Sequence, residues 1–152
     1  MIVHRPPTRW VARPEVSTVF LAGSIEMGAA PDWQSALVRA LEPRELTILD
    51  PRRAEWDASW RQSIEEPQFR EQVEWELDGL DGADVIAMWF APATRAPITL
   101  LELGLHARGG KLVVGCPDGY WRKGNVEVVC ARHGVPLVHD WPAFVAAVVA
   151  RC

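Results

Sequence analysis

The sequence predicts an α/β protein with a doubly wound, five-stranded parallel sheet and helices on both faces. The main observation is that short apolar runs typical of strands alternate five times with segments of helical periodicity. The second is the largely apolar run 83–90, which suits a buried central strand. The third is the length of 152 residues, which suits one domain with a sizeable core.

The first 15 residues differ from the rest of the chain. They contain three prolines and show no periodicity, so we expect a surface arm over residues 1–15 and a single domain over residues 16–152. Residues 16–22 are β-branched and apolar, which predicts the first strand, and Gly23 and Ser24 end it.

A helix and a short strand come next. Trp33, Leu37 and Leu41 share one face at helical spacing, which predicts a helix over about residues 31–41. Residues 46–49 then read as a second strand, which the sequence Asp-Pro ends.

Residues 52–66 are the least regular part of the chain, and they hold Trp56 and Trp60. A long, aromatic-rich loop in a small domain more often serves function or an interface than a mere connection. Apolar residues spaced by three or four then predict a helix over residues 67–80.

The second half of the chain continues the alternation. After the strand at 83–90 we expect a helix over residues 99–108, ended by Gly109 and Gly110. The remaining expected elements are a strand at 112–115, a helix from residue 123 or 125 to 132, an edge strand at 135–138 and a last helix capped by residues 140–142.

The most economical order of these five strands is 2-1-3-4-5, with right-handed crossovers. This order places the switch point between the first and third strands, where open α/β proteins bind ligands. The loop at residues 23–25 and the segment leading to Glu102 both end there. The sequence therefore predicts a ligand site in this crevice.

Composition excludes several classes of protein. The net charge of −4 argues against a nucleic-acid-binding protein that holds its partner by neutralising phosphates. Cys116, Cys130 and Cys152 are odd in number and lack metal-ligand spacing, so we expect reduced thiols, no metal and no other cofactor. No segment reads as a signal peptide or a membrane span, and we expect a cytoplasmic protein with no membrane partner.

The segment 23–28 begins Gly23-Ser24-Ile25, follows a strand and precedes a helix. Its backbone N–H groups could hold a phosphate or sugar oxygen. It has neither the Walker ending nor the GxGxxG pattern, and a plain glycine turn explains it equally well.

Glu102 has two interpretations. The sequence Thr99-Leu100-Leu101-Glu102 fits a capping box in the first helical turn, in which the glutamate reaches back to the N-cap amide. Alternatively, the helix N-terminus keeps Glu102 ionised as a nucleophile. Spacing alone favours the cap.

Glu76 lies near the end of the preceding helix, beside Trp75. A solvated helix face is the ordinary explanation of such a glutamate. However, Glu76 precedes the central strand closely enough to lean over the same crevice as Glu102.

Several short motifs together resemble the nucleoside 2-deoxyribosyltransferase-like family. Their order and spacing span residues 18–140. The resemblance implies a flavodoxin-like fold, in agreement with the topology above, and transfer of the sugar of a deoxynucleoside from one base to another. The motifs are Phe20-Leu21-Ala22-Gly23-Ser24-Ile25, Asp50-Pro51-Arg52-Arg53, Trp75-Glu76, Ala83-Asp84-Val85-Ile86, Leu101-Glu102-Leu103-Gly104 and Trp121-Arg122-Lys123-Gly124-Asn125-Val126.

The resemblance also implies roles for individual residues. Glu102 is expected to attack the anomeric carbon of the sugar, and Glu76 to contact the base or sugar as a second acid. Asn125 falls where an asparagine of a neighbouring subunit meets the 5′-hydroxyl, which implies a homo-oligomer with shared active sites. The residues expected to bind substrate are Gly23, Ser24, Ile25, Asp50, Arg52, Trp89 and Asn125.

Two positions depart from the pattern of the better-known transferases. Val19 stands where they carry a tyrosine that hydrogen-bonds the nucleophile, and Ala96 where they carry an aspartate that contacts the sugar. The neighbouring deoxynucleoside 5′-monophosphate N-glycosidases share a Gly-Ser-Ile loop that contacts phosphate. Arg52, Arg53 and Arg95 could supply charge for such a phosphate.

Three functions therefore stay open at the level of the sequence. The first is a transferase that exchanges bases through a covalent glycosyl-glutamate. The second is an N-glycosidase, a hydrolase of nucleosides or nucleoside 5′-monophosphates, and the third is a non-catalytic nucleotide-binding domain. The expected partners are a nucleoside or nucleotide and a free nucleobase, with no nucleic acid polymer.

Overall fold

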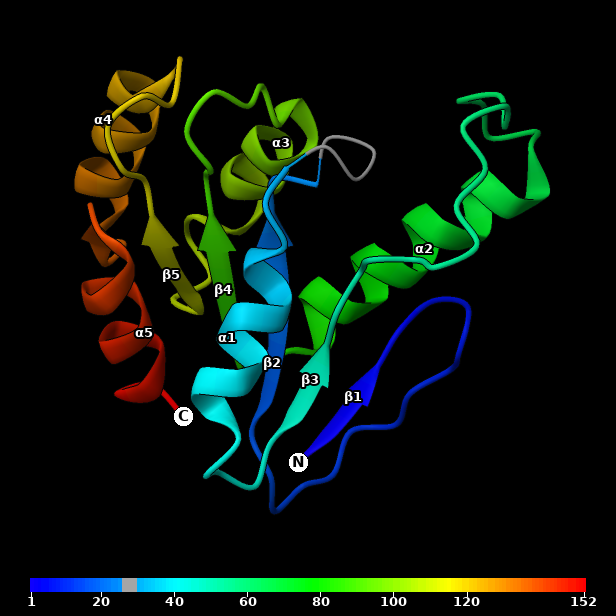
Figure 1. Ribbon diagram of the computed structural model, residues 1–152, viewed down its shortest axis with the longest axis horizontal. Helices are drawn as coiled ribbons and strands as arrows, with labels where there is room; N and C mark the ends of the chain where they lie inside the picture. Colours follow the sequence, from blue (N-terminus) through cyan, green and yellow to red (C-terminus); the bar gives the residue numbers. More distant parts are fainter. Residues whose placement is uncertain (26–29) are drawn as a thin grey trace.

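The computed structural model describes residues 1–25 and 30–152 and has the predicted α/β architecture, with a parallel sheet between two layers of helices (Figure 1). The strands are β1 (Ile2–His4), β2 (Thr18–Gly23), β3 (Thr47–Leu49), β4 (Val85–Trp89), β5 (Leu112–Gly115) and β6 (Leu137–Val138). The helices are α1 (Trp33–Leu41), α2 (Pro67–Gly82), α3 (Pro97–His106), α4 (Lys123–His133) and α5 (Trp141–Val149). Within the described residues, no helix has the length and apolarity needed to cross a membrane.

The sheet of the described residues has six strands, in the order β1-β3-β2-β4-β5-β6. The last five have the expected order 2-1-3-4-5, and the switch point lies between β2 and β4. The expected number of five strands was wrong. Ile2–His4 lies inside the segment predicted to be an arm, yet it pairs in parallel with β3 as an edge strand.

The rest of the N-terminal segment is fixed along β3 and α2. Arg5 pairs with Asp50, which follows β3, over 2.8 Å between Nε and Oδ2. The indole N–H of Trp75 donates to the carbonyl oxygen of Thr8 over 2.9 Å. Trp10 packs against Gly82, where a Cβ would collide with its ring. These contacts brace α2 from its outer side.

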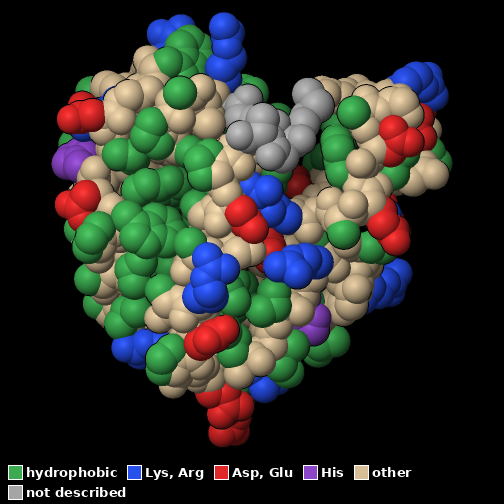
Figure 2. Space-filling model, in the orientation of Figure 1, with side chains coloured by type: hydrophobic (Ala, Val, Ile, Leu, Met, Phe, Trp, Pro, Cys, Tyr) green, Lys and Arg blue, Asp and Glu red, His purple; other side chains and the backbone are tan. Residues whose placement is uncertain are grey.

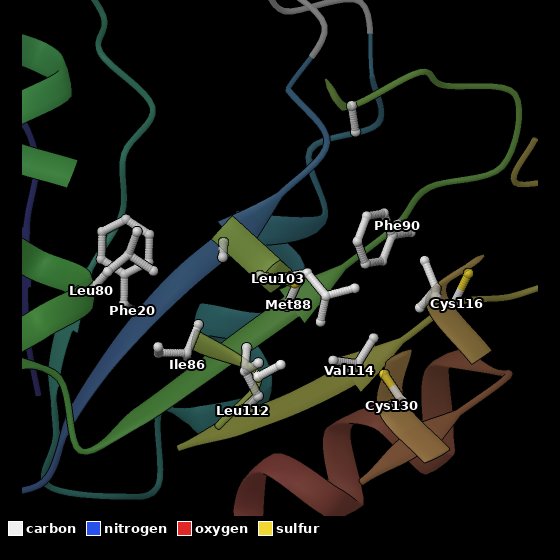
Figure 3. Packing of buried hydrophobic residues seen from close by; sticks show 14 of the residues in the cluster. Phe20, Leu80, Ile86, Met88, Phe90, Leu103, Leu112, Val114, Cys116 and Cys130 are labelled. Atoms are coloured by element: carbon white, nitrogen blue, oxygen red, sulfur yellow. The ribbon is translucent and has the colours of Figure 1, made fainter. Parts of the chain in front are cut away.

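The two faces of the sheet carry separate apolar cores. Figure 3 shows the core beneath α2, α3 and α4, where residues such as Phe20, Met88 and Leu103 interlock. The opposite core beneath α1 and α5 contains Val19, Trp89 and other apolar side chains. Each strand therefore sends alternate residues into different cores.

Aspartates cap the beginnings of α1 and α5. The Asp32 carboxylate accepts from the N–H of Ser35 over 3.1 Å, and that of Asp140 accepts from the N–H of Ala143 over 2.8 Å. These bonds satisfy N–H groups in the first turn that have no partner within the helix.

The predicted start of α3 at Thr99 was wrong. The helix begins at Pro97. Proline suits the first helical position because its φ is fixed near the helical value and an N–H there would have no partner within the helix. Ala96 precedes it in the left-handed conformation, with φ of 41°. Thr99 is therefore inside the helix, and Glu102 lies beyond its first turn. The capping box is absent.

Gly23 ends β2 at a position that requires glycine. Its φ of 151° is unfavourable for other residues, and a Cβ there would collide with the Trp89 carbonyl oxygen and the Trp33 ring. We expect Gly23→Ala to reduce the free energy of unfolding in urea by roughly 2–4 kcal/mol. The matched control Gly124→Ala, in open space on α4, should leave it within about 1 kcal/mol of the wild type. Equal stability of both variants would contradict this explanation.

Candidate functional site

Glu76 on α2 and Glu102 on α3 lie close enough for the charge of Glu76 to act on Glu102. Both helices pack over β2 and bury residues in the same core. Gly79 of α2 lies on the Phe20 ring, so Glu76, one turn earlier, lies closer to the carboxyl end of β2. Glu102 of α3 is only 8% exposed, and Glu76 is partly buried. The structure thus brings together the two residues predicted to be catalytic.

Burial controls the protonation of this pair. Burial, and then the nearby charge of Glu76, raise the pKa of Glu102 to about 8. Burial also raises the pKa of Glu76, while a hydrogen bond from Gln72 opposes that rise. Two neighbouring carboxyl groups that are largely removed from water cannot both ionise cheaply, so near neutral pH the pair holds a proton.

Gln72 is a site residue that the sequence analysis missed. Its side-chain nitrogen Nε2 donates to Glu76 Oε1 over 2.8 Å and to the carbonyl oxygen of Pro51 over 2.9 Å. It thereby joins Glu76 to the loop that follows β3. The spacing of four residues between Gln72 and Glu76 on one helix was the signal that could have revealed this pair.

Ser24 lies at the predicted switch point and is fully buried. Its hydroxyl shares a hydrogen bond of 2.7 Å with the Thr94 hydroxyl and accepts from the N–H of Ala91, while its own N–H donates to the Trp89 carbonyl. Ser24 therefore ties the end of β2 to the loop after β4. Ile25 beside it is partly buried, and the rest of the predicted segment, Glu26, Met27 and Gly28, lies outside the described residues.

Asp50 and Arg52 follow β3 and are held within the protein. Besides pairing with Arg5, the buried Asp50 carboxylate accepts from the N–H of Arg52. The Arg52 side chain donates to Gln34 Oε1 over 2.8 Å and lies 3.5 Å from Asp32. Both residues therefore join the β3 loop to its neighbours at the carboxyl edge of the sheet.

Trp89 does not lie with the two glutamates. Its side chain enters the opposite core, where its ring lies over Gly115 and contacts Trp141 and Phe144 at centroid distances of 5.2 and 5.1 Å. Figure 2 shows hydrophobic side chains gathered over this side, around α5 and α1. A shallow apolar pocket of about 310 Å³ lies there between Trp33, Trp89 and Trp141.

The tryptophan-bearing loop at 52–66 packs onto the beginning of α2. Arg53 pairs with Glu71 over 3.0 Å and lies 5.1 Å from the Trp60 ring centre, and Trp60 meets Trp56 edge to face. Together with the first turns of α2, this loop projects beyond the sheet (Figure 1).

The remaining predicted positions lie on either face of the sheet. Asn125 is exposed in the first turn of α4. Val19 is fully buried in the core beneath α1 and α5, so its side chain points away from the face that carries the glutamates. Phe20 is the neighbouring β2 residue that faces α2. Among the described residues, no group of His, Cys, Asp or Glu side chains could hold a metal ion.

Comparison with known proteins gives a family and a fold. The family model described as "Nucleoside 2-deoxyribosyltransferase like" matches residues 16–120, which is well over half of the chain. The fold resembles the crystal structure of a conserved protein from Enterococcus faecalis V583, with a TM-score of 0.65 and 12% identity. That match covers 90% of this chain and 99% of the other. No curated protein sequence matches significantly.

Proposed function

The chain belongs to the nucleoside 2-deoxyribosyltransferase-like family, and we propose that it cleaves the N-glycosidic bond of a deoxynucleoside and transfers the 2-deoxyribosyl group to another base. The observation that carries this proposal is the buried pair Glu102 and Glu76, which interact across α2 and α3. Such pairs of carboxyl groups perform glycoside chemistry because one can bond to the sugar while the other moves a proton.

The proposed first step is a displacement at the anomeric carbon. A Glu102 oxygen forms a bond to that carbon as the bond to the base nitrogen breaks, and the electron pair leaves with the base. Glu76 supplies the proton that neutralises the departing base. In the second step, a new base loses its N–H proton to Glu76 and displaces Glu102, so that the configuration at the sugar is retained.

Substrate binding is proposed for the residues around the switch point. The loop Gly23-Ser24-Ile25, with Asp50 and Arg52, borders the carboxyl edge of the sheet where the substrate would enter. Because Ser24 and Arg52 are engaged within the protein, they support a role in shaping this edge more than direct phosphate binding. This favours a nucleoside over a nucleoside 5′-monophosphate as the substrate.

Product analysis separates the candidate functions. We expect incubation with a deoxynucleoside and a second free base to yield a new deoxynucleoside, detected by liquid chromatography. Base and free sugar alone would identify a hydrolase that uses the same first step. Binding without turnover of nucleosides or monophosphates would identify a non-catalytic domain and contradict the proposal.

We further propose that the protein works as a homo-oligomer with shared active sites. The outer side of α3, the helix that carries Glu102, is apolar: Ile98, Leu101 and Leu105 are each 59% exposed. Beside them Gly104 faces open space, which would let a second helix approach closely. Exposed apolar stripes of this kind favour self-association. Asn125, exposed in the first turn of α4, is the residue that we propose a second copy contributes to a neighbouring site.

This surface leads to a prediction for Leu105→Glu. A carboxylate buried without a partner in an apolar contact costs at least roughly 1–3 kcal/mol, so self-association should weaken by about tenfold or more. Analytical ultracentrifugation over a range of concentrations measures the change. The control Ile64→Glu alters a 74% exposed apolar residue in the loop before α2 and should leave the oligomer unchanged. An oligomer that persists in Leu105→Glu would exclude α3 as the contact.

A further inference from the structure

Gln72 is a buried, neutral side chain that donates a hydrogen bond to Glu76, one member of the acid pair. We propose that its amide decides which of the two facing carboxyl groups holds the proton: Gln72 keeps Glu76 ionised and leaves the proton on Glu102 until substrate binds. This inference rests on the proposed function and adds to it a positioning residue with a defined effect.

The hydrogen bonds fix the orientation of the amide. The Pro51 carbonyl can only accept, so the Gln72 nitrogen must face it, over 2.9 Å. The same nitrogen donates its other hydrogen to Glu76 Oε1 over 2.8 Å. A donated hydrogen stabilises a carboxylate more than a carboxylic acid, so this contact selects the charged form of Glu76.

The unused end of the amide supports a special role. Gln72 is only 4% exposed, and its acceptor Oε1 is buried with no hydrogen-bond partner among the described residues. An orphaned buried acceptor destabilises a protein, and an apolar side chain in its place would avoid that cost. The Gln72 amide therefore lowers the stability of the protein at the position from which it donates to Glu76.

No other described group offsets this bias. Glu102 experiences burial and the charge of Glu76, and Glu76 experiences burial and the Gln72 bond. Burial lowers the pKa of His106, one turn beyond Glu102, and the charges that act on it are those of Asp81 and Lys111. Burial raises the pKa of Glu76, the bond from Gln72 opposes that rise, and the resulting charge on Glu76 raises the pKa of Glu102 in turn.

A proton held by the pair can turn Glu76 into the acid of the reaction without changing the total charge of the two glutamates. When a nucleoside enters the crevice, the proton passes from Glu102 to Glu76. Glu102 becomes the carboxylate that bonds to the sugar, and Glu76 becomes the acid that protonates the base nitrogen. The proton that leaves with the base is thus the one stored on Glu102 in the free protein.

The test is a titration of the free protein by NMR with ¹³C-labelled glutamate carboxyl groups. Glu102→Gln and Glu76→Gln assign the two signals. In the wild type, we expect the Glu102 signal to titrate near pH 8 and that of Glu76 at lower pH. In Gln72→Met, we expect Glu76 to titrate at a higher pH than in the wild type, and Glu102 at a lower pH. The matched control Gln68→Met alters an exposed glutamine one turn earlier on α2 and should change neither signal.

The wild-type titration tests the inference even if Gln72→Met fails to fold. A wild-type Glu76 that titrates above Glu102, or a folded Gln72→Met variant with unchanged titrations, would overturn the role of Gln72. The measurement needs no substrate and is therefore independent of turnover. An inactive protein with the expected titrations would support the role of Gln72 and contradict the proposed function alone.

Discussion

Replacement of Glu102 by alanine is expected to abolish turnover of deoxynucleosides while leaving the fold intact. The nucleophile supplies the covalent bond to the sugar, and loss of a nucleophile typically lowers kcat by on the order of 10⁴-fold or more. The protein should tolerate the change because Glu102 pairs with no cation in the described residues and is unfavourably buried when ionised. Initial rates of base release, with circular dichroism as a check of folding, measure both effects.

The matched control is Glu74→Ala on α2. Glu74 is exposed and pairs with Arg70 over 2.6 Å on the outer side of the helix, so its loss should change the rate by less than about twofold. Glu102→Gln, which keeps the size of the side chain, should be as inactive as Glu102→Ala. Activity that survives in both Glu102 variants would reduce this residue to a structural role.

The second large effect is expected in the pH dependence of stability. Burial and Glu76 raise the pKa of Glu102 from its ordinary 4.5 to about 8. Between these values the folded protein binds more protons than the unfolded chain, so the free energy of unfolding must fall as the pH rises through this window. Stability from this group is fully present below about pH 4.5 and is lost by about pH 8. The rise of the pKa from 4.5 to about 8 corresponds to a loss on the order of 5 kcal/mol.

Urea unfolding of the wild type and Glu102→Gln at several pH values measures this loss. The glutamine cannot ionise, so the variant should lose less stability between pH 5 and pH 8 and become the more stable protein at the upper end. Glu74→Gln, at an exposed position, should follow the wild-type curve. Parallel curves for the wild type and Glu102→Gln would show that Glu102 ionises at an ordinary pH in the folded protein.

Most of the fold was predictable because local sequence patterns determine most of its helices and strands. The alternation of buried runs and helical stripes gave the order of the last five strands, and the aspartates before α1 and α5 marked their starts. β1 was missed because three residues followed by prolines carry too little pattern, and their pairing with β3 spans more than forty residues. Pro97 moved the start of α3 earlier than the capping-box pattern at Thr99 predicted.

The proximity of Glu76 to Glu102 could be predicted from the sequence, whereas the surroundings of these two acids could not. Glu76 and Glu102 do interact, as the switch-point topology suggested. The face on which Trp89 and Val19 lie was not predictable, because β4 is entirely apolar, β2 is apolar after Thr18, and no polar alternation marks the two sides. Gln72 was missed because a glutamine on a charged helix resembles a solvated residue until its contacts are known.

The central claim, that Glu102 bonds to the sugar, is tested most directly by trapping the intermediate. The protein is mixed with a deoxynucleoside, quenched with acid within a fraction of a turnover, digested and examined by mass spectrometry. We expect the peptide that contains Glu102 to gain the mass of one deoxyribosyl group, and this gain to disappear when a second base is added before the quench. Turnover without any such adduct, in a protein that loses no activity on Glu102→Ala, would contradict the account.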